Sequence, residues 1–199
     1  MLLCDIGNTS YHFLQGETNY KKSVLTFDPR TLKETVHYIC VEPRIKKLLK
    51  TLTNWIDLSE KIDKSTYYPT MGIDRIVACK AIQNGVVVDA GSAITVDVVS
   101  EGVFKGGFIY PGSRFMKEAY KNISSALDYE FNYELDLSTL PKNSQDAISF
   151  GYLKLLYSEI NSYKMPIVLT GGDASLLKHI FPQAQINSTL IFDGMKKLI

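Results

Sequence analysis

The chain has 199 residues, of which 45% are hydrophobic and 22% charged, a composition typical of a folded soluble protein with one large domain or two small ones. Lys and Arg number 22 against 21 Asp and Glu, so the formal net charge is +1. This balance gives no reason to expect a nucleic acid or an anionic membrane as a partner. No run approaches the roughly 20 apolar residues of a membrane span.

The cysteines and the N-terminus indicate a cytoplasmic protein. Cys4, Cys40 and Cys79 are scattered and form no CxxC pair, which predicts reduced, buried thiols rather than a zinc site or a disulfide framework. Asp5 interrupts the first apolar run and no basic segment precedes that run, so the start of the chain does not resemble a secretory signal.

The first eighty residues predict a strand meander followed by helices. An apolar run at 1–4 ends at an Asp-Gly break, and strands at 11–15 and 23–27 would be joined by a turn at 16–19. Helical spacing of apolar residues predicts an amphipathic helix over 41–52. The basic face of this helix is interpreted as a solvated face rather than a nucleic-acid-binding one, because the total charge of the chain is close to neutral. That face comprises Arg44, Lys46, Lys47 and Lys50.

The rest of the chain begins with a helix and then repeats the meander. A Tyr-rich stretch ends at Pro69, and the helix is predicted over 73–82. β-branched runs then predict strands at 86–88 and 94–99, and a third strand is expected at 103–110. Helices are expected at 111–126 and 144–163, with a polar linker at 128–142 between them. The chain should end with a strand, a Gly-Gly turn and a helix within 166–181, followed by a short strand at 190–192 and a terminal helix.

One unit therefore occurs twice: a strand, an Asp-x-Gly turn, two more strands and a helix. This predicts an α/β fold made of two half-domains. We place them at 1–80 and 81–199, with the terminal helix of the second able to pack back on the first. The cleft between two such halves is the natural place for a ligand.

The two Asp-x-Gly turns carry the clearest chemistry. In Asp5-Ile6-Gly7-Asn8-Thr9-Ser10 the glycine allows a tight turn whose N–H groups can approach an anion. The segment from Asp89 to Asp97 repeats the arrangement, with Ser92 as the hydroxyl. One such turn is most often a plain hairpin. Two in register, each with a carboxylate, suit a polyphosphate that carries a metal ion.

Gly72-Ile73-Asp74-Arg75 has two readings of equal weight. An Asp in the first turn of a helix complements the helix dipole, and the Arg is then simply solvated. In the functional reading, Asp74 accepts a proton from a substrate hydroxyl and Arg75 binds a substrate carboxylate.

Further glycine-rich turns follow predicted strands. Gly106-Gly107 can be a bulge that permits close packing, whereas Gly171-Gly172, between strand and helix, suits a nucleotide. There is no GxxxxGK[ST], GxGxxG or GxSxG motif, so a Walker-type ATPase is excluded. The three histidines, His12, His37 and His179, show no Ser or Cys partner pattern, so a hydrolase triad is poorly supported.

Taken together and in order, DIGNT, GIDR, DAGSAITVD, GGFIYPG and TGGD resemble the motif set of the type III pantothenate kinases, over almost the whole chain. The resemblance implies the fold of the actin, Hsp70 and sugar-kinase superfamily, with two RNase H-like half-domains and mixed sheets around a central nucleotide cleft. It also implies ATP-dependent phosphorylation of pantothenate to 4′-phosphopantothenate, the first step of coenzyme A synthesis, by a homodimer that uses magnesium with ATP and a monovalent cation, potassium or ammonium.

The resemblance also implies roles for individual residues. Asp74 would be the proton acceptor and Asp89 the potassium ligand. Ser144 would reach pantothenate from the other subunit. The ATP contacts would be Asp5, Ile6, Gly7, Asn8, Thr9, Ser10, Tyr11, His12 and Ser92, and the pantothenate contacts would be Tyr68, Gly72, Ile73, Asp74 and Arg75.

The chain departs from the family pattern at three points. Ser92 and Ser144 stand where the family usually has Thr, and both keep the hydroxyl. The substrate-contacting Tyr lies closer to GIDR than usual, so Tyr68 is assigned with Tyr67 as the alternative. The chain is also short for the family.

Two rival functions belong to different classes. A non-catalytic regulatory relative would have no physical need for Asp5, Asp74 and Asp89 together. The other rival is a different kinase or phosphatase of the superfamily that acts on a sugar, a polyphosphate or another small acceptor. Arg75 beside Asp74 argues against a neutral sugar, which would have nothing for Arg75 to neutralise.

Overall fold

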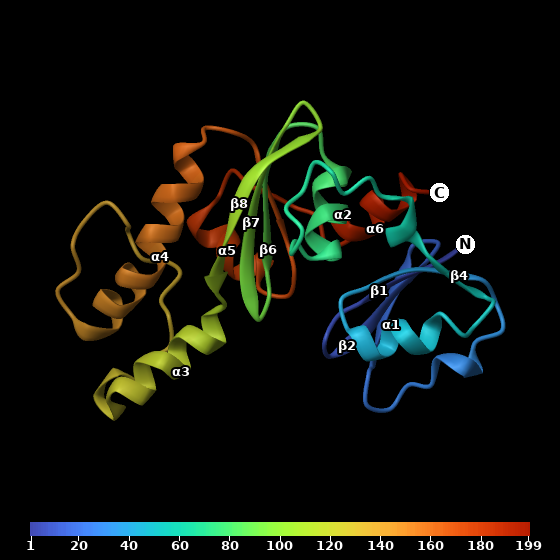
Figure 1. The fold of residues 1–199 in the computed structure, drawn as a ribbon. Coiled ribbons are helices and arrows are strands. Elements are labelled where there is room, and N and C mark those ends of the chain that lie inside the picture. The colour runs from blue at the N-terminus through green and yellow to red at the C-terminus, as the bar shows by residue number, and fades with distance from the viewer. The chain divides into compact units, whose positions relative to one another are not determined.

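The computed structural model describes residues 1–199, and the chain divides into two compact units. The first unit comprises residues 1–82 together with 189–199, and the second comprises residues 83–188 (Figure 1). All of the helices are too short or too polar to span a lipid bilayer.

The first unit is built on a mixed five-stranded sheet in the order β3-β2-β1-β4-β5. The first three strands pair antiparallel, whereas β4 pairs parallel with β1 and with β5. The strands are β1 (Leu2–Ile6), β2 (Ser10–Gln15), β3 (Thr18–Ser23), β4 (Val36–Cys40) and β5 (Trp55–Asp57).

The expected strand at 23–27 is wrong, because β3 lies over 18–23. Gln15 pairs with Thr18, so the hairpin turn is only two residues long, and its first residue, Gly16, has a φ of 60°. After Ser23 the chain turns away, and the Phe27 N–H donates to the Ser23 carbonyl at 3.0 Å. Val24 and Phe27 instead pack against the core of the sheet.

Three α-helices belong to this unit: α1 (Pro43–Leu49), α2 (Ile73–Ala81) and α6 (Leu190–Lys196). Helix α1 is shorter than the expected 41–52, because the Glu42 carboxylate caps it by accepting from the Ile45 N–H at 2.7 Å and Pro43 occupies its first turn. Short 3-10 helices lie at Pro29–Thr31 and Leu58–Lys61.

The expected strand at 190–192 is also wrong. Residues 190–196 form α6, in which Leu190 and Gly194 are buried four residues apart and Phe192 and Met195 three apart. This helical spacing is hidden in the sequence by the apolar run at 190–192. The short strand that precedes α6 is β10 (Gln185–Ile186), in the other unit.

The basic face of α1 is partly used inside the unit. Lys46 Nζ lies 3.1 Å from Asp57 Oδ2 and donates to Ser59 Oγ at 2.9 Å. Lys50 Nζ lies 3.5 Å from Glu60 Oε1. Arg44, Lys47 and Lys50 are exposed, which agrees with the predicted solvated face, whereas Lys46 is half-buried against Asp57.

The second unit has a sheet of the same form, in the order β10-β9-β6-β7-β8. Strands β6, β7 and β8 form the antiparallel meander, and β9 pairs parallel with β6 and with β10. Its elements are β6 (Gly85–Ala90), β7 (Ala93–Ser100), β8 (Val103–Pro111), α3 (Ser113–Ile123), the 3-10 helix Ser125–Leu127, α4 (Ser144–Ser162), β9 (Ile167–Thr170) and α5 (Ala174–Ile180).

Each sheet has its own apolar core. In the first unit the core is aromatic, with Tyr11, Phe13 and Trp55 in edge or stacked contacts. In the second unit the strand residues Val86 and Val88 are fully buried in one cluster with the α4 face that includes Leu153. Burial of these side chains holds the strands in place, and the glycine turns that follow β1 and β6 lie at the ends of those strands.

Candidate functional site

The first glycine turn joins β1 to β2. Asp5 lies at the end of β1, partly buried, and pairs directly with His12 of β2. The Gly7 N–H donates to the Ser10 carbonyl at 3.0 Å and closes the turn, while the tip residues Asn8 and Thr9 are exposed. The turn thus presents backbone and short polar side chains to solvent, next to a carboxylate.

Two backbone hydrogen bonds brace this turn from neighbouring segments. The Val41 N–H, which follows β4, donates to the Ile6 carbonyl at 3.0 Å. The Val24 N–H, which follows β3, donates to the Thr9 carbonyl at 3.1 Å. Both ends of the turn are therefore held by the unit's own sheet.

Two expected ATP contacts on this turn have buried side chains. Ile6 is fully buried and Tyr11 is 2% exposed in the aromatic core, where burial raises the pKa of the Tyr11 hydroxyl to about 12. Only their backbone groups could face a ligand. His12 packs edge-on against Phe192, with ring centroids 4.8 Å apart, and burial followed by the charge of Lys21 lowers its pKa.

The second turn joins β6 to β7 in the same way. The Gly91 N–H donates to the Ala93 carbonyl at 3.1 Å, and Ser92 is exposed at the tip. Asp89 lies at the end of β6, opposite Thr95 of β7 on one side and Thr170 of β9 on the other. Oxygen-bearing side chains therefore occur on three adjacent strands at this position.

The second turn is braced by the two further glycine motifs. The Gly112 N–H donates to the Ser92 carbonyl at 3.1 Å, and the Asp173 N–H donates to the Ala90 carbonyl at 2.9 Å. A hydroxyl links the two braces, because Ser113 Oγ donates to Asp173 Oδ2 at 2.8 Å.

The approach of these braces requires glycine. A Cβ at Gly112 would overlap the carbonyl oxygens of Gly91 and Ser92. A Cβ at Gly171 would overlap the Ala90 carbonyl and the Asp89 carboxylate, and Gly171 has a φ of 87°. The motifs GGFIYPG and TGGD thus converge on the Asp89 turn, which their separate positions in the chain could not show.

The Gly-Ile-Asp-Arg motif forms the start of α2, with Gly72 as its N-cap. The Asp74 carboxylate lies over Gly72 and accepts from the Arg75 N–H at 2.9 Å. The Arg75 side chain is only 6% exposed, so it is not the solvated arginine of the purely structural reading.

Tyr68 is the aromatic partner of Arg75. The guanidinium donates to the Tyr68 hydroxyl, and its central carbon lies 5.8 Å from the centroid of the Tyr68 ring. Tyr68 itself is 41% exposed. The structure therefore brings together Tyr68, Gly72, Asp74 and Arg75 at one helix start.

Ser144 is the first residue of α4 and is exposed. Asn143 caps the helix by accepting from the Asp146 N–H at 2.9 Å, and Gln145 Nε2 donates to the Glu130 carbonyl at 3.1 Å. Of the expected site residues, Ser144, Asp89 and Ser92 belong to the second unit and all the others to the first.

Two of the surface hollows of the second unit are rich in charged side chains. One, of about 490 Å³, is lined by Ser113, Arg114, Lys117, Tyr133 and Asp173 among others, and so adjoins the braces of the Asp89 turn.

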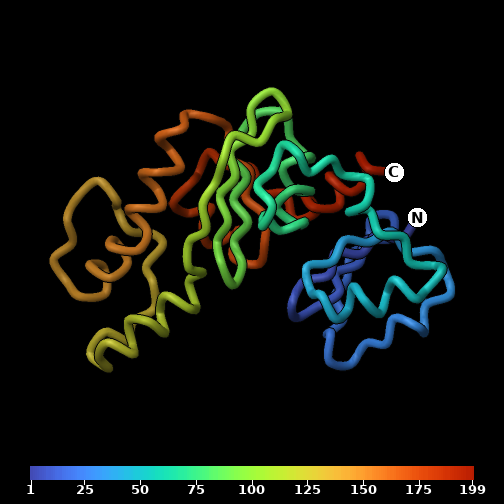
Figure 2. Tube along the Cα trace, in the orientation of Figure 1, coloured from blue at the N-terminus to red at the C-terminus, as the bar shows by residue number.

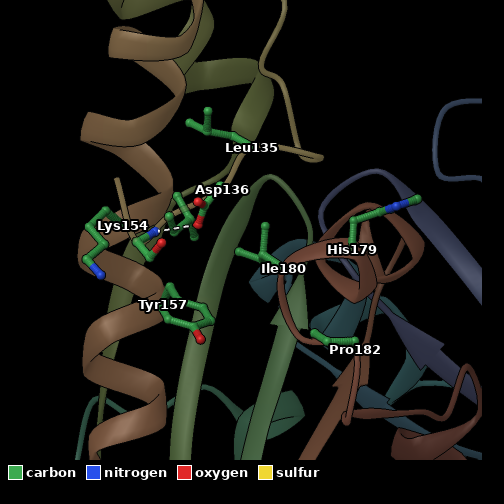
Figure 3. A pocket seen from close by; sticks show the side chains of 9 residues that line it. Leu135, Asp136, Lys154, Tyr157, His179, Ile180 and Pro182 are labelled. Atoms are coloured by element: carbon green, nitrogen blue, oxygen red, sulfur yellow. Dashed lines mark hydrogen bonds between the residues drawn. The ribbon is translucent and has the colours of Figure 1, made fainter. Parts of the chain in front are cut away.

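The other hollow, of about 460 Å³, lies between α4, α5 and the segment around Asp136 (Figure 3). Its polar groups do not converge: Asp136 accepts from the Ser138 N–H at 2.8 Å, and His179 Nδ1 lies 2.5 Å from Glu134. In Figure 3 the side chains of His179 and Lys154 point to opposite sides, away from Ile180 between them.

The architecture defines the class of protein. Two mixed sheets of the same strand order are the fold of the actin-like ATPases and sugar kinases, as predicted. A Sinorhizobium meliloti protein described as a 2-dehydro-3-deoxygalactonokinase superposes with a TM-score of 0.57 at 10% identity, over 99% of this chain and 95% of that one.

The sequence comparisons give the family. The profile described as type III pantothenate kinase matches residues 41–164. A type III pantothenate kinase of Sulfurimonas denitrificans is 57% identical over all of this chain and 97% of its own length, and one of Helicobacter hepaticus is 40% identical over 100% and 98%. This chain belongs to the type III pantothenate kinase family.

A solved structure agrees over the full length. A conserved Campylobacter jejuni protein assigned to the Baf family of transcriptional activators superposes with a TM-score of 0.90 at 40% identity, over 100% of this chain and 97% of that one. Family membership confirms the resemblance read from the motifs, and with it the prediction of a kinase that phosphorylates pantothenate in coenzyme A biosynthesis.

Proposed function

We propose that Asp74 and Arg75 at the start of α2 hold and activate pantothenate for transfer of the ATP γ-phosphoryl group to its primary hydroxyl. The observation that carries this proposal is the geometry of that helix start. A carboxylate lies over Gly72, and beside it in the chain a buried guanidinium is held by Tyr68. An anionic substrate with a hydroxyl needs both groups, and a neutral sugar needs only the first.

Asp74 acts on the hydroxyl. It accepts the hydroxyl proton as the oxygen bonds to the γ-phosphorus, and the bond from that phosphorus to the bridging oxygen breaks to release ADP. Asp74 lies in the first turn of α2, where its carboxylate already accepts from the Arg75 N–H at 2.9 Å.

Arg75 binds the pantothenate carboxylate. Its contact with Tyr68 orients the guanidinium, a planar group whose N–H donors match the geometry of a carboxylate. This arrangement supports Tyr68, rather than Tyr67, as the tyrosine at the substrate site. Arg75 binds ground state and transition state alike, so it contributes to affinity.

The glycine turns bind ATP. The first turn offers its backbone from Asp5 to His12, with the side chains of Asn8, Thr9 and Ser10, and Ser92 contacts ATP from the second. Backbone N–H groups suit phosphate oxygens, and magnesium bound to ATP offsets the charge of nearby carboxylates.

Asp89 holds the monovalent cation, potassium or ammonium. The surrounding chemistry fits such an ion: a carboxylate, two neighbouring threonines and backbone carbonyls are all oxygen donors. No group of three or more His, Cys, Asp or Glu side chains is arranged to hold a metal ion. A bound cation would offset phosphate charge next to the turn.

A second copy of the chain completes the substrate site through Ser144. Its position at the exposed first turn of α4 leaves the hydroxyl accessible to another subunit. The proposed assembly is a homodimer.

The test is ADP release by the purified protein with ATP, magnesium and pantothenate, in potassium and then in sodium. We expect turnover that depends on pantothenate and on potassium. ADP release without pantothenate would indicate another acceptor. No ADP release, together with specific DNA binding, would favour a regulator, the role for which the Campylobacter jejuni relative is named.

A further inference from the structure

The C-terminal helix α6 contacts two elements of the first unit that carry proposed site residues. Phe192 and Met195 on its apolar face are at most 1% exposed. In Figure 2 the C-terminal segment, in red, runs beside α2, in green. α6 also contacts β1, which ends near the first glycine turn.

The contact with α2 leaves no space for a side chain. A Cβ at Gly194 would overlap the Val77 carbonyl oxygen and would lie 2.9 Å from Val77 Cγ1. Val77 is one helical turn after Asp74. Lys197 Nζ donates to the Ala81 carbonyl at 3.0 Å, so α6 also holds the far end of α2.

The contact with the sheet is made by Phe192. Its ring lies 4.8 Å from the His12 ring at an interplanar angle of 71°. His12 is directly opposite Asp5, and side chains of directly opposed residues lie on the same face of a sheet. α6 therefore covers the sheet face on which Asp5 lies.

We infer that Gly194 and Phe192 are positioning residues for the phosphoryl transfer. Gly194 sets how closely α2, with Asp74, approaches α6, and Phe192 sets how α6 sits on the β2 strand of the first turn. Together they fix Asp74 relative to Asp5 within the first unit. The inference rests on the roles proposed above for Asp5 and Asp74.

Gly194→Ala tests the α2 contact. The added methyl must push α2 and α6 apart, and displacements of about 1 Å can cost a hundredfold in rate. We expect kcat to fall at least tenfold and the pantothenate KM to change, while the ATP KM stays within about twofold. The matched control is Gly16→Ala, which strains the β2–β3 turn of the same unit where nothing lies within 4 Å, and it should lower Tm without changing kcat.

Phe192→Leu tests the sheet contact separately. Leucine keeps an apolar side chain in the core but loses the ring contact with His12. We expect the ATP KM to rise severalfold while the pantothenate KM stays unchanged, the opposite of the Gly194→Ala signature. A merely structural role would not separate the two substrates.

Amide hydrogen exchange over residues 73–81 gives a readout that needs no activity. Exchange should rise in Gly194→Ala and stay at the wild-type level in Gly16→Ala. Equal exchange in both variants, or wild-type kcat and KM values in Gly194→Ala below its Tm, would overturn the inference.

Two further outcomes concern a Gly194→Ala variant that does not fold and a wild-type protein without activity. If Gly194→Ala does not fold, the substrate split of Phe192→Leu decides, and equal changes in both KM values overturn the inference. If the wild-type protein itself shows no turnover with pantothenate, the proposed function fails, and exchange over residues 73–81 alone judges the positioning role.

Discussion

The two units build similar turns, the second one residue shorter than the first, and brace them in the same way but with different residues. In the first unit the backbone N–H groups of Val41 and Val24 donate to the carbonyls of Ile6 and Thr9, respectively. In the second unit Asp173 and Gly112 donate to the equivalent carbonyls of Ala90 and Ser92, at 2.9 and 3.1 Å against 3.0 and 3.1 Å. In each unit one of these N–H groups follows the third strand of the unit (β3 or β8), and the other follows the fourth strand (β4 or β9).

The difference lies in how much room the braces leave. The residues that brace the first turn are valines, which carry side chains. The turn glycines themselves are open in both units, with a single atom near a Cβ at 3.9 Å for Gly7 and at 3.6 Å for Gly91. In the second unit Gly112 and Gly171 leave no room for a Cβ. The comparison shows that the duplicated feature is the braced turn, whereas the packing density around it is specific to each half.

The largest effect that we expect is on turnover, from Asp74→Asn. Asparagine keeps the shape but cannot accept the hydroxyl proton, and loss of a general base typically costs 10²- to 10⁴-fold in rate. We therefore expect kcat to fall at least 100-fold with little change in pantothenate binding by calorimetry. Asp63→Asn, which changes an exposed carboxylate that accepts only from Ser65, is the control and should keep wild-type kcat. Near-normal turnover by Asp74→Asn would remove Asp74 from the mechanism.

Gly171→Ala tests the tight brace of the second unit. The methyl overlaps the Ala90 carbonyl, and the positive φ disfavours alanine, so we expect a loss of about 2–3 kcal/mol in the free energy of unfolding and weaker ATP binding. Gly172→Ala has nothing within 4 Å of its Cβ and should be close to neutral. Urea unfolding of both variants makes the measurement. Equal stabilities would mean that the second turn is as tolerant as the first.

Arg75→Ala should act on affinity. Loss of a charged hydrogen-bonding partner costs about 1.5–3 kcal/mol, so the pantothenate KM should rise roughly 10- to 100-fold while kcat changes less. Tyr68→Phe, which removes only the hydroxyl that accepts from Arg75, should raise KM a few-fold. Steady-state kinetics at saturating ATP measure both, and an unchanged KM in Arg75→Ala would reject a carboxylate-binding role.

The smallest effect concerns acid stability of the first unit. Burial alone would raise the pKa of Asp57, but hydrogen bonds from Ser59 and the ion pair with Lys46 outweigh burial and lower that pKa. A lowered pKa stabilises the folded state above the unfolded value of about 4, and this stabilisation is lost as pH falls through the folded-state pKa. Asp57→Asn should therefore unfold with a shallower pH dependence below about pH 4, as circular dichroism would show. An unchanged slope would mean that other carboxylates govern acid unfolding.

Much of the fold follows from local sequence signals. The β-branched runs of β6 and β7 and the helical pattern of α4 placed those elements within one or two residues of their observed bounds. Strands β4 and β5 and the true extent of β3 were not predicted. Their short runs lack alternation, and their positions depend on pairing with β1, β4 and β2.

The site was partly predictable for a similar reason. A turn between adjacent strands is local, so the Asp5 and Asp89 turns could be read directly from the chain. The convergence of Gly112 and Gly171 on Asp89 could not, since these contacts join residues distant in sequence. The same holds for the burial of Arg75 against Tyr68 and the approach of Gly194 to Val77.

The most direct test of the central claim is the fate of the γ-phosphoryl group. The wild-type protein is incubated with pantothenate, magnesium, potassium and ATP whose γ-phosphate carries ¹⁸O, and pantothenate is then recovered for mass spectrometry. Our account predicts 4′-phosphopantothenate that carries the label, from wild type but not from Asp74→Asn. Labelled inorganic phosphate with unmodified pantothenate would contradict the account.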